Sequence, residues 1–91
     1  MEIPPNTIGM KNSKFAPENL KVYVHTKVTW KNDDTKMHIL NFYDGVKLNN
    51  TPRLDPGEEF TYIFTAPATI KFQDVILLDK MRGQIVVENV P

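Results

Sequence analysis

The sequence contains no cysteine. Disulfide bonds, thiolate nucleophiles, zinc fingers and iron–sulfur clusters are therefore excluded, and so is any bond between copper and a thiolate. Serine occurs once, at Ser13, and histidine twice, at His25 and His38. Because the chain also lacks a nucleophile elbow, a Walker loop and a dinucleotide fingerprint, we do not expect an enzyme.

An excess of charge and a long apolar run are missing as well. Eleven basic and eleven acidic residues give a formal net charge of zero, so nucleic acid is not an expected partner, because neutralising its phosphates needs a basic excess. The longest purely apolar run is residues 75–78, far short of the roughly 20 residues that cross a bilayer. We expect a soluble monomer without membrane insertion, or the mature part of a longer precursor.

The length of 91 residues allows one compact domain. Residues 1–5 form a lead-in, and residues 6–91 form the single domain. Seven prolines interrupt the chain, and no interval between them carries a sustained apolar stripe of period 3.6, which argues against helices of ordinary length.

Alternating apolar and polar residues instead predict about seven short strands. The pattern favours an edge strand at 7–12, a bend at 15–17, and a type II turn at Pro56 and Gly57. The largest candidate core residues are Trp30 and the aromatic residues at 60, 62 and 64, which occupy alternate positions of one predicted strand. This spacing fits a sandwich or a small barrel, and periodicity alone does not decide between them. The remaining strands are expected at 20–25, 28–31, 37–42, 60–65, 70–72 and 85–87.

Several short motifs occur in an order that resembles one family. They are F-A-P-E-N-L at 15–20, V-Y-V-H-T-K-V-T-W-K-N at 22–32, D-D at 33–34 followed by His38, L-D-P-G-E-E-F at 54–60, F-T-A-P at 64–67 and M-R-G-Q-I-V-V at 81–87. This order is similar to that of the cupredoxins, small blue-copper proteins. The resemblance implies an all-β, cupredoxin-like Greek-key β-sandwich, with copper as the family's cofactor, electron transport as its activity, and an extracytoplasmic (periplasmic or secreted) location.

The departures from the family fall at the metal. A type 1 copper site uses two histidines and a cysteine thiolate, with a weak axial methionine. His38 matches the first histidine and Met81 the methionine, whereas Asp74 or Val75 stands at the place of the cysteine. Leu77 or Leu78 stands at the place of the second histidine. The resemblance therefore implies the fold with a degenerate copper site, and no cofactor is required.

Two interpretations of His38 remain open. With Met37 and Met81, it supplies one imidazole and two thioethers, which suit Cu(I); with Asp74 or Asp79 as an oxygen ligand, the set suits Zn(II) or Cu(II) better. Alternatively, His38 makes a hydrogen bond to the backbone while both methionines fill the core. His25 is expected to be structural, and Asp33 and Asp34 are expected to be solvated turn residues.

The apolar run Val75, Ile76, Leu77 and Leu78 occupies the family's ligand loop. It either plugs the former metal cavity or forms an exposed patch for a protein partner. The leading functional hypothesis is a non-enzymatic binding or accessory module without a type 1 copper centre. The alternatives are a copper or zinc protein with an altered ligand set, and a cupredoxin in which the cysteine and second histidine were deliberately replaced.

Overall fold

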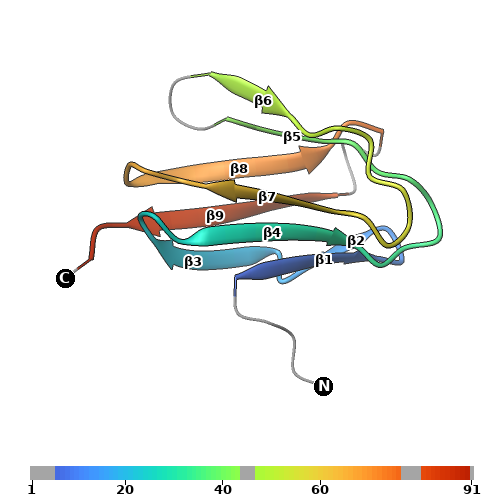
Figure 1. The fold of residues 1–91 in the computed structure, drawn as a ribbon, viewed down its shortest axis with the longest axis horizontal. Helices are drawn as coiled ribbons and strands as arrows, with labels where there is room; N and C mark the ends of the chain where they lie inside the picture. The colour runs from blue at the N-terminus through green and yellow to red at the C-terminus, as the bar shows by residue number, and fades with distance from the viewer. Residues whose placement is uncertain (1–5, 44–46, 77–80, 91) are drawn as a thin grey trace.

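The computed structural model describes residues 6–43, 47–76 and 81–90, which form two facing β-sheets (Figure 1). No helix occurs in these ranges. The four-stranded sheet has the order β2 (Lys14–Ala16), β1 (Thr7–Lys11), β4 (Lys27–Asn32) and β7 (Glu59–Ile63). The five-stranded sheet has the order β3 (Asn19–Tyr23), β9 (Arg82–Glu88), β8 (Ala68–Asp74), β5 (Leu40–Tyr43) and β6 (Leu48–Asn50). The all-β sandwich predicted from the sequence is confirmed.

The structure adds strands to the predicted set. The described ranges contain nine strands instead of about seven, and the short strands β2 and β6, of three residues each, were not expected. The segment at 7–12 is also not an edge strand, because β1 lies between β2 and β4. Asn12 and Ser13, with φ of 54° and 58°, reverse the chain in a two-residue turn, so the expected bend at 15–17 begins as an outer strand.

Each sheet contains one parallel pair of strands. β1 runs parallel to β4, and β3 runs parallel to β9, whereas the other neighbours are antiparallel. Although β3 and β4 follow each other in the sequence, they belong to different sheets. The chain passes from one sheet to the other at His25, which is exposed and has a φ of 67°.

The core between the sheets is built around Trp30, which is fully buried. Its ring stacks on Phe42 at 5.4 Å and meets Phe72 edge-on at 5.6 Å, arrangements that favour aromatic pairs. Within the described residues, its indole N–H is the buried side-chain polar atom that lacks a hydrogen-bond partner. In the aromatic row of β7, Phe60 is only half-buried because β7 is an edge strand.

Two glycines occupy positions where a side chain would be strained or would not fit. Gly57 has a φ of +88° and follows Pro56, and the N–H of Glu58 donates to the carbonyl of Asp55 at 2.9 Å, so the predicted type II turn is present. Gly83 lies opposite Phe72 in β9, and a Cβ there would lie 2.6 Å from the carbonyl oxygen of Glu18 and against the Phe72 ring. A side chain at position 83 would therefore displace the ring or the backbone.

Candidate functional site

Three inward-facing rows of side chains end in polar residues at one end of the sandwich. The segments that follow β4, β6 and β8 gather there, at the right in Figure 1. Because side chains alternate across a strand, each row continues the core and then meets the polar residue. The rows are Val28, Trp30 and Asn32 in β4; His38, Leu40 and Phe42 leading into β5; and Ile70, Phe72 and Asp74 in β8.

His38 lies between two carboxylates at this end. Its Nδ1 makes a hydrogen bond with Oδ2 of Asp74, and its Nε2 lies 3.0 Å from Oδ2 of Asp34. The side chains of Asp34, His38 and Asp74 are 9%, 3% and 0% exposed. We call these three residues the Asp–His–Asp cluster. Charges this deeply buried are tolerated when they are paired and hydrogen-bonded.

Both ring nitrogens of His38 are engaged by these contacts. An ionised carboxylate only accepts hydrogen bonds, so the imidazole is the donor wherever the facing carboxyl group is ionised.

Asp34 is positioned by the loop that follows β4. Its own N–H donates to Oδ1 of Asn32 at 2.9 Å, and its carboxylate accepts the backbone N–H groups of Thr35 at 2.8 Å and Ser13 at 3.2 Å. The hydrogen bond with His38, and then that with the Thr35 N–H, holds the pKa of Asp34 below its ordinary value of 3.8. Asp34 is thus ionised throughout the neutral range.

Asn32 holds the base of the same loop. Its side-chain amide donates to the carbonyl oxygens of Lys36 and Leu54, both at 2.8 Å. The backbone of His38 bridges to that of Leu54 in the antiparallel sense. These bonds connect the loop between β4 and β5 to the segment before β7.

Asp74 is positioned by the end of β8. Its Oδ1 accepts the N–H of Ile76 at 2.7 Å, and its own N–H donates to the carbonyl of Met81 at 3.1 Å. The Met81 side chain is 1% exposed and belongs to the core. Of the two candidates for the place of the family's cysteine, Asp74 is therefore the one that faces His38, and the half-buried Val75 follows it.

The structure brings some of the predicted metal ligands together and separates another. His38 and Asp74 are in contact, the backbone of Met81 is bonded to that of Asp74, and the side chain of Met37 is 40% exposed. In the described ranges, no three or more His, Cys, Asp or Glu side chains are grouped to hold a metal ion. The ligand set therefore stays a prediction.

The residues present do not fit type 1 copper. That site needs a thiolate, and the sequence has none. Both nitrogens of His38 already face carboxylates, on opposite sides of the ring. A metal at Nδ1 would have to displace the hydrogen bond to Asp74.

Asp34 is the site residue that the sequence analysis missed. Its expected role as a solvated turn residue is wrong, because its carboxylate contacts His38. His38 does bond the backbone of Leu54 through its own N–H and C=O, but its ring contacts two carboxylates. Of the two methionines expected in the core, Met81 is buried there and Met37 is 40% exposed. The signal available for Asp34 was its position four residues before His38 in the sequence.

The apolar run after β8 is only partly described. Val75 is half-buried, and Ile76 is 53% exposed. Leu77, Leu78 and Asp79 lie outside the described residues, so neither a plug nor a patch is established by them. In the described ranges, the chain forms no helix of the length and apolarity needed to cross a membrane.

Solved structures with a similar fold include a cupredoxin, an amicyanin and a copper-containing nitrite reductase. A purple cupredoxin from Nitrosopumilus maritimus has a TM-score of 0.80 and 26% identity, over 90% of this chain and 98% of that one. The reduced state of an amicyanin mutant has a TM-score of 0.83 and 25% identity, over 92% and 82%. A copper-containing nitrite reductase from Thermus scotoductus SA-01 has a TM-score of 0.83 and 27% identity; the match takes in 100% of this chain but 24% of that one.

These neighbours place the fold among the small copper-protein sandwiches. Residues 2–87 match the cupredoxin-like domain family. The chain therefore belongs to that family, and the recognition made from its motifs is confirmed. A comparison with curated proteins found no match.

Proposed function

We propose that this chain is a non-enzymatic binding or accessory module of the cupredoxin-like family, acting outside the cytoplasm, that does not transfer electrons through type 1 copper. The observation that carries the proposal is the contact between Asp74 and Nδ1 of His38. It uses the one histidine that matches a family ligand in a buried hydrogen bond. The location is inferred from the family resemblance alone.

The donor chemistry supports a non-redox role. A soft thiolate suits both oxidation states of copper, whereas carboxylate and imidazole favour harder, divalent ions. With Asp74 in place of a thiolate, the site lacks the ligand that makes fast electron exchange practical. The work of the module then lies on its surface, and the exposed Ile76 side chain at the same end is a candidate contact for a protein partner.

Metal titration tests the proposal. Cu(I), Cu(II) and Zn(II) are added separately to the native protein, with calorimetry for affinity and NMR of the His38 ring for location. We expect no shift of the His38 ring signals at one equivalent of metal. Binding of micromolar affinity or tighter that moves these signals would overturn the proposal. The variant His25→Gln is the control, because it removes the other, exposed histidine. A colourless solution with copper decides nothing, since every hypothesis predicts it.

The second candidate function is a copper or zinc protein in which His38 and Asp74 coordinate the ion and Met81 completes the set. The observation in its favour is the bond between the Asp74 N–H and the Met81 carbonyl, which joins the two segments at the site. A metal that binds only the folded state raises the melting temperature. This rise should disappear in Met81→Leu if the thioether is a ligand, and persist if Met81 only fills the core.

A substitution at Asp74 tests whether this is the old copper position. Asp74→Cys would place a thiol next to Nδ1 of His38. If the position is equivalent, Cu(II) added to this variant should give a thiolate-to-copper absorption band. The matched control is Gln73→Cys, on the outer face of the same strand, where no band is expected.

A further inference from the structure

The strand β7 forms one edge of the four-stranded sheet (Figure 1). In the described part of the chain it pairs with β4 alone. An edge strand presents a row of backbone N–H and C=O groups that can pair with another chain. The backbone of β7 is therefore a candidate binding surface.

Two hydrogen bonds of β4 show which backbone groups of β7 face outward. The N–H of Asn32 donates to the carbonyl of Glu58 on the β7 side at 2.9 Å, whereas the N–H of Thr29 donates to the carbonyl of Asn6 on the β1 side at 3.0 Å. Because the bonded positions alternate along an antiparallel pair, the even-numbered residues of β7 bond to β4. The N–H and C=O groups that point away from the sheet belong to the odd-numbered residues Glu59, Thr61 and Ile63.

The other three sheet edges carry features that hinder pairing, and β7 lacks them. Short strands, lysines and prolines all protect an edge. β2 has three residues and includes Lys14, β6 has three residues, and β3 includes Lys21. β7 has five residues and contains no lysine, glycine or proline. Its charged residue, Glu59, is paired in register with Lys31 of β4, so β7 is the least protected edge of the described sheets.

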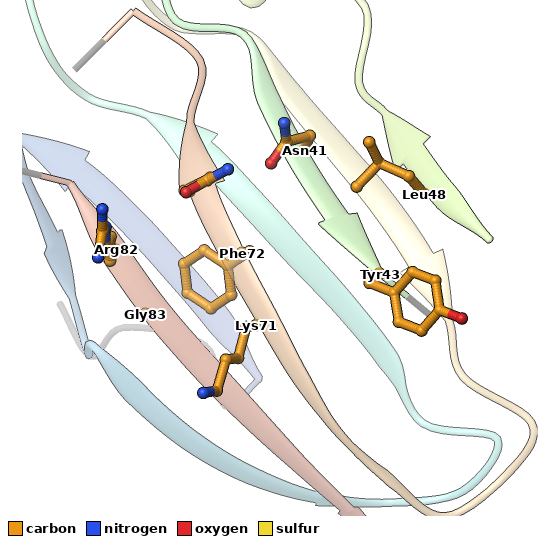
Figure 2. Close-up of a pocket in the computed structure, with 8 residues that line it drawn as sticks. Asn41, Tyr43, Leu48, Lys71, Phe72, Arg82 and Gly83 are labelled. Carbon is orange, nitrogen blue, oxygen red and sulfur yellow. The ribbon is translucent and has the colours of Figure 1, made fainter. Parts of the chain in front are cut away.

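The two sheets differ in width beside this edge. The rings of Tyr62 in β7 and Phe42 in β5 are 4.9 Å apart, so β7 faces β5 across the core, and β6 lies one strand farther out. Tyr43 and Leu48 point to the outer face of the five-stranded sheet, where they line a shallow hollow (Figure 2). The half-buried Asn49 of β6 is paired with Phe42 and points to the inner face. On this side the described four-stranded sheet is one strand narrower, which corresponds to about 4.8 Å.

We propose that β7 binds an extended segment of a partner protein as an additional, antiparallel strand of the four-stranded sheet. Main-chain hydrogen bonds to the outward-pointing groups of β7 supply the affinity in this mode of recognition. A second copy of this chain does not fit the same place. Identical antiparallel strands are related by a two-fold axis perpendicular to the sheet, and because β7 faces β5, that axis would bring β5 of the copy to the position of β6. The inference extends the proposed role as a binding module to a surface other than Ile76.

The side chains of β7 determine which segment fits best. On the outer face, the hydroxyl of Thr61 lies 3.3 Å from that of Thr29, and Ile63 is 47% exposed. Threonine and other β-branched residues form favourable cross-strand pairs with such neighbours. On the inner face, an apolar residue of the segment would cover the half-buried Phe60. The expected segment therefore alternates threonine on the outer face with valine or isoleucine on the inner face.

The test uses NMR of the ¹⁵N-labelled protein with a capped probe peptide of alternating threonine and valine that has a lysine at each end. Without peptide, the amide hydrogens of Glu59, Thr61 and Ile63 should exchange with solvent faster than those of Phe60 and Tyr62. Equal rates would show that the edge is already paired, and would overturn the proposal. With peptide, we expect saturable shifts and slower exchange of the three outward amides, with a dissociation constant of about 1 mM or tighter.

Thr61→Pro separates backbone pairing from side-chain contact. Proline removes the N–H that points outward and retains the hydrogen bonds to β4, and it is tolerated on edge strands. The peptide should bind at least about tenfold more weakly to this variant. The matched control is Thr61→Ala, which loses the side chain but keeps the N–H, and should bind within about twofold of the native protein.

Methylated peptides test the same hydrogen bonds without depending on the folding of a variant. In the antiparallel register, N-methyl groups on two of the threonines remove donors that face β7, whereas N-methyl groups on two of the valines remove donors that point away from it. We expect the first peptide to lose binding and the second to retain it.

Four results would overturn this proposal. They are the absence of saturable binding, shifts located on other strands, unchanged affinity of Thr61→Pro, and equal or reversed binding of the two methylated peptides. Shifts of the β7 amides on dilution of the protein without peptide would indicate pairing between copies, and would reject a partner segment. All of these readouts lie on β7, so their failure is distinguishable from a failure of the metal titration at His38.

Discussion

The middle of the sandwich and its polar end are both buried, but they are stabilised by different interactions. In the middle, Trp30, Phe42 and Phe72 pack as aromatic rings, and no charge is present. At the polar end, the side chains of His38 and Asp74 are nearly as inaccessible, and that of Asp34 is 9% exposed. Apolar packing depends on area and shape, whereas a buried ionic cluster depends on every partner being present. A single substitution should therefore destabilise either region. A second substitution beside it should restore stability at the polar end but not in the apolar middle.

The largest expected effect is that of His38→Ala. It leaves Asp74 buried without its partner, and breaking a buried charge pair in this way costs about 3 to 5 kcal/mol. Denaturant unfolding followed by the fluorescence of Trp30, the single tryptophan, measures the free energy of unfolding.

A second substitution separates the two regions. His38→Leu combined with Asp74→Leu should recover most of the lost stability, because an apolar replacement of both partners is often neutral or stabilising. In the middle of the core, Phe72→Ala should cost about 3 to 5 kcal/mol as well, and adding Phe15→Leu beside it should not restore stability. A double leucine variant that is less stable than His38→Ala would contradict the comparison.

Gly83→Ala is expected to have a smaller effect. The new Cβ would press on the Phe72 ring and lie 2.6 Å from the carbonyl oxygen of Glu18, and overpacking of this kind costs about 1 to 3 kcal/mol. Gly9→Ala is the matched control in β1, since its Cβ would meet its nearest neighbour, Asp33 Oδ2, at 3.4 Å. Equal thermal stability of the two variants would show that the backbone near Glu18 shifts to accommodate the new Cβ.

Acid should weaken the polar end and leave the apolar middle unaffected. Because the pKa of Asp34 is lower in the folded state than its ordinary value of 3.8, its ionised form stabilises the fold above about pH 4. That contribution is lost as the pH falls through the lower, folded-state value. In Asp34→Asn, the decline of the melting temperature below pH 4 should be shallower than in the native protein. Parallel pH profiles for the two proteins would show that other carboxyl groups cause the acid sensitivity.

The smallest expected effect lies on the surface. Lys21 and Glu88 are 3.3 Å apart, with side chains that are 68% and 44% exposed, and exposed pairs contribute no more than about 1 kcal/mol. Glu88→Gln should change the free energy of unfolding by less than that amount at moderate salt. A loss comparable to that of His38→Ala would mean that position 88 acts through something other than this ion pair.

The residues that pack the apolar middle could be predicted from the sequence, whereas the contacts at the polar end could be predicted only in part. Alternation through Val28 and Trp30, or through Ile70 and Phe72, identifies the faces that fill the core, because the period of two depends only on the local strand. The motif order then gave the family. The number of strands was underestimated because β2 and β6 are three residues long, too short to show a period.

The contacts of His38 depend on tertiary geometry. Asp74 is 36 residues away in the sequence, and nothing in the sequence around it indicates a contact with His38. Asp34 is only four residues away, but a turn rich in Asp and Asn has a sufficient local explanation, which hid its contact with the ring. Only the convergence of three inward rows at one end shows that these side chains meet.

The position of β9 limits when the five-stranded sheet can form during synthesis of the chain. This strand, which ends at Glu88, lies between β3 and β8 in the five-stranded sheet. Until it is present, β3 has no partner in its own sheet, and the inner face of that sheet lacks Ile85 and Val87. A growing chain therefore cannot close this sheet on the ribosome before its last strand emerges.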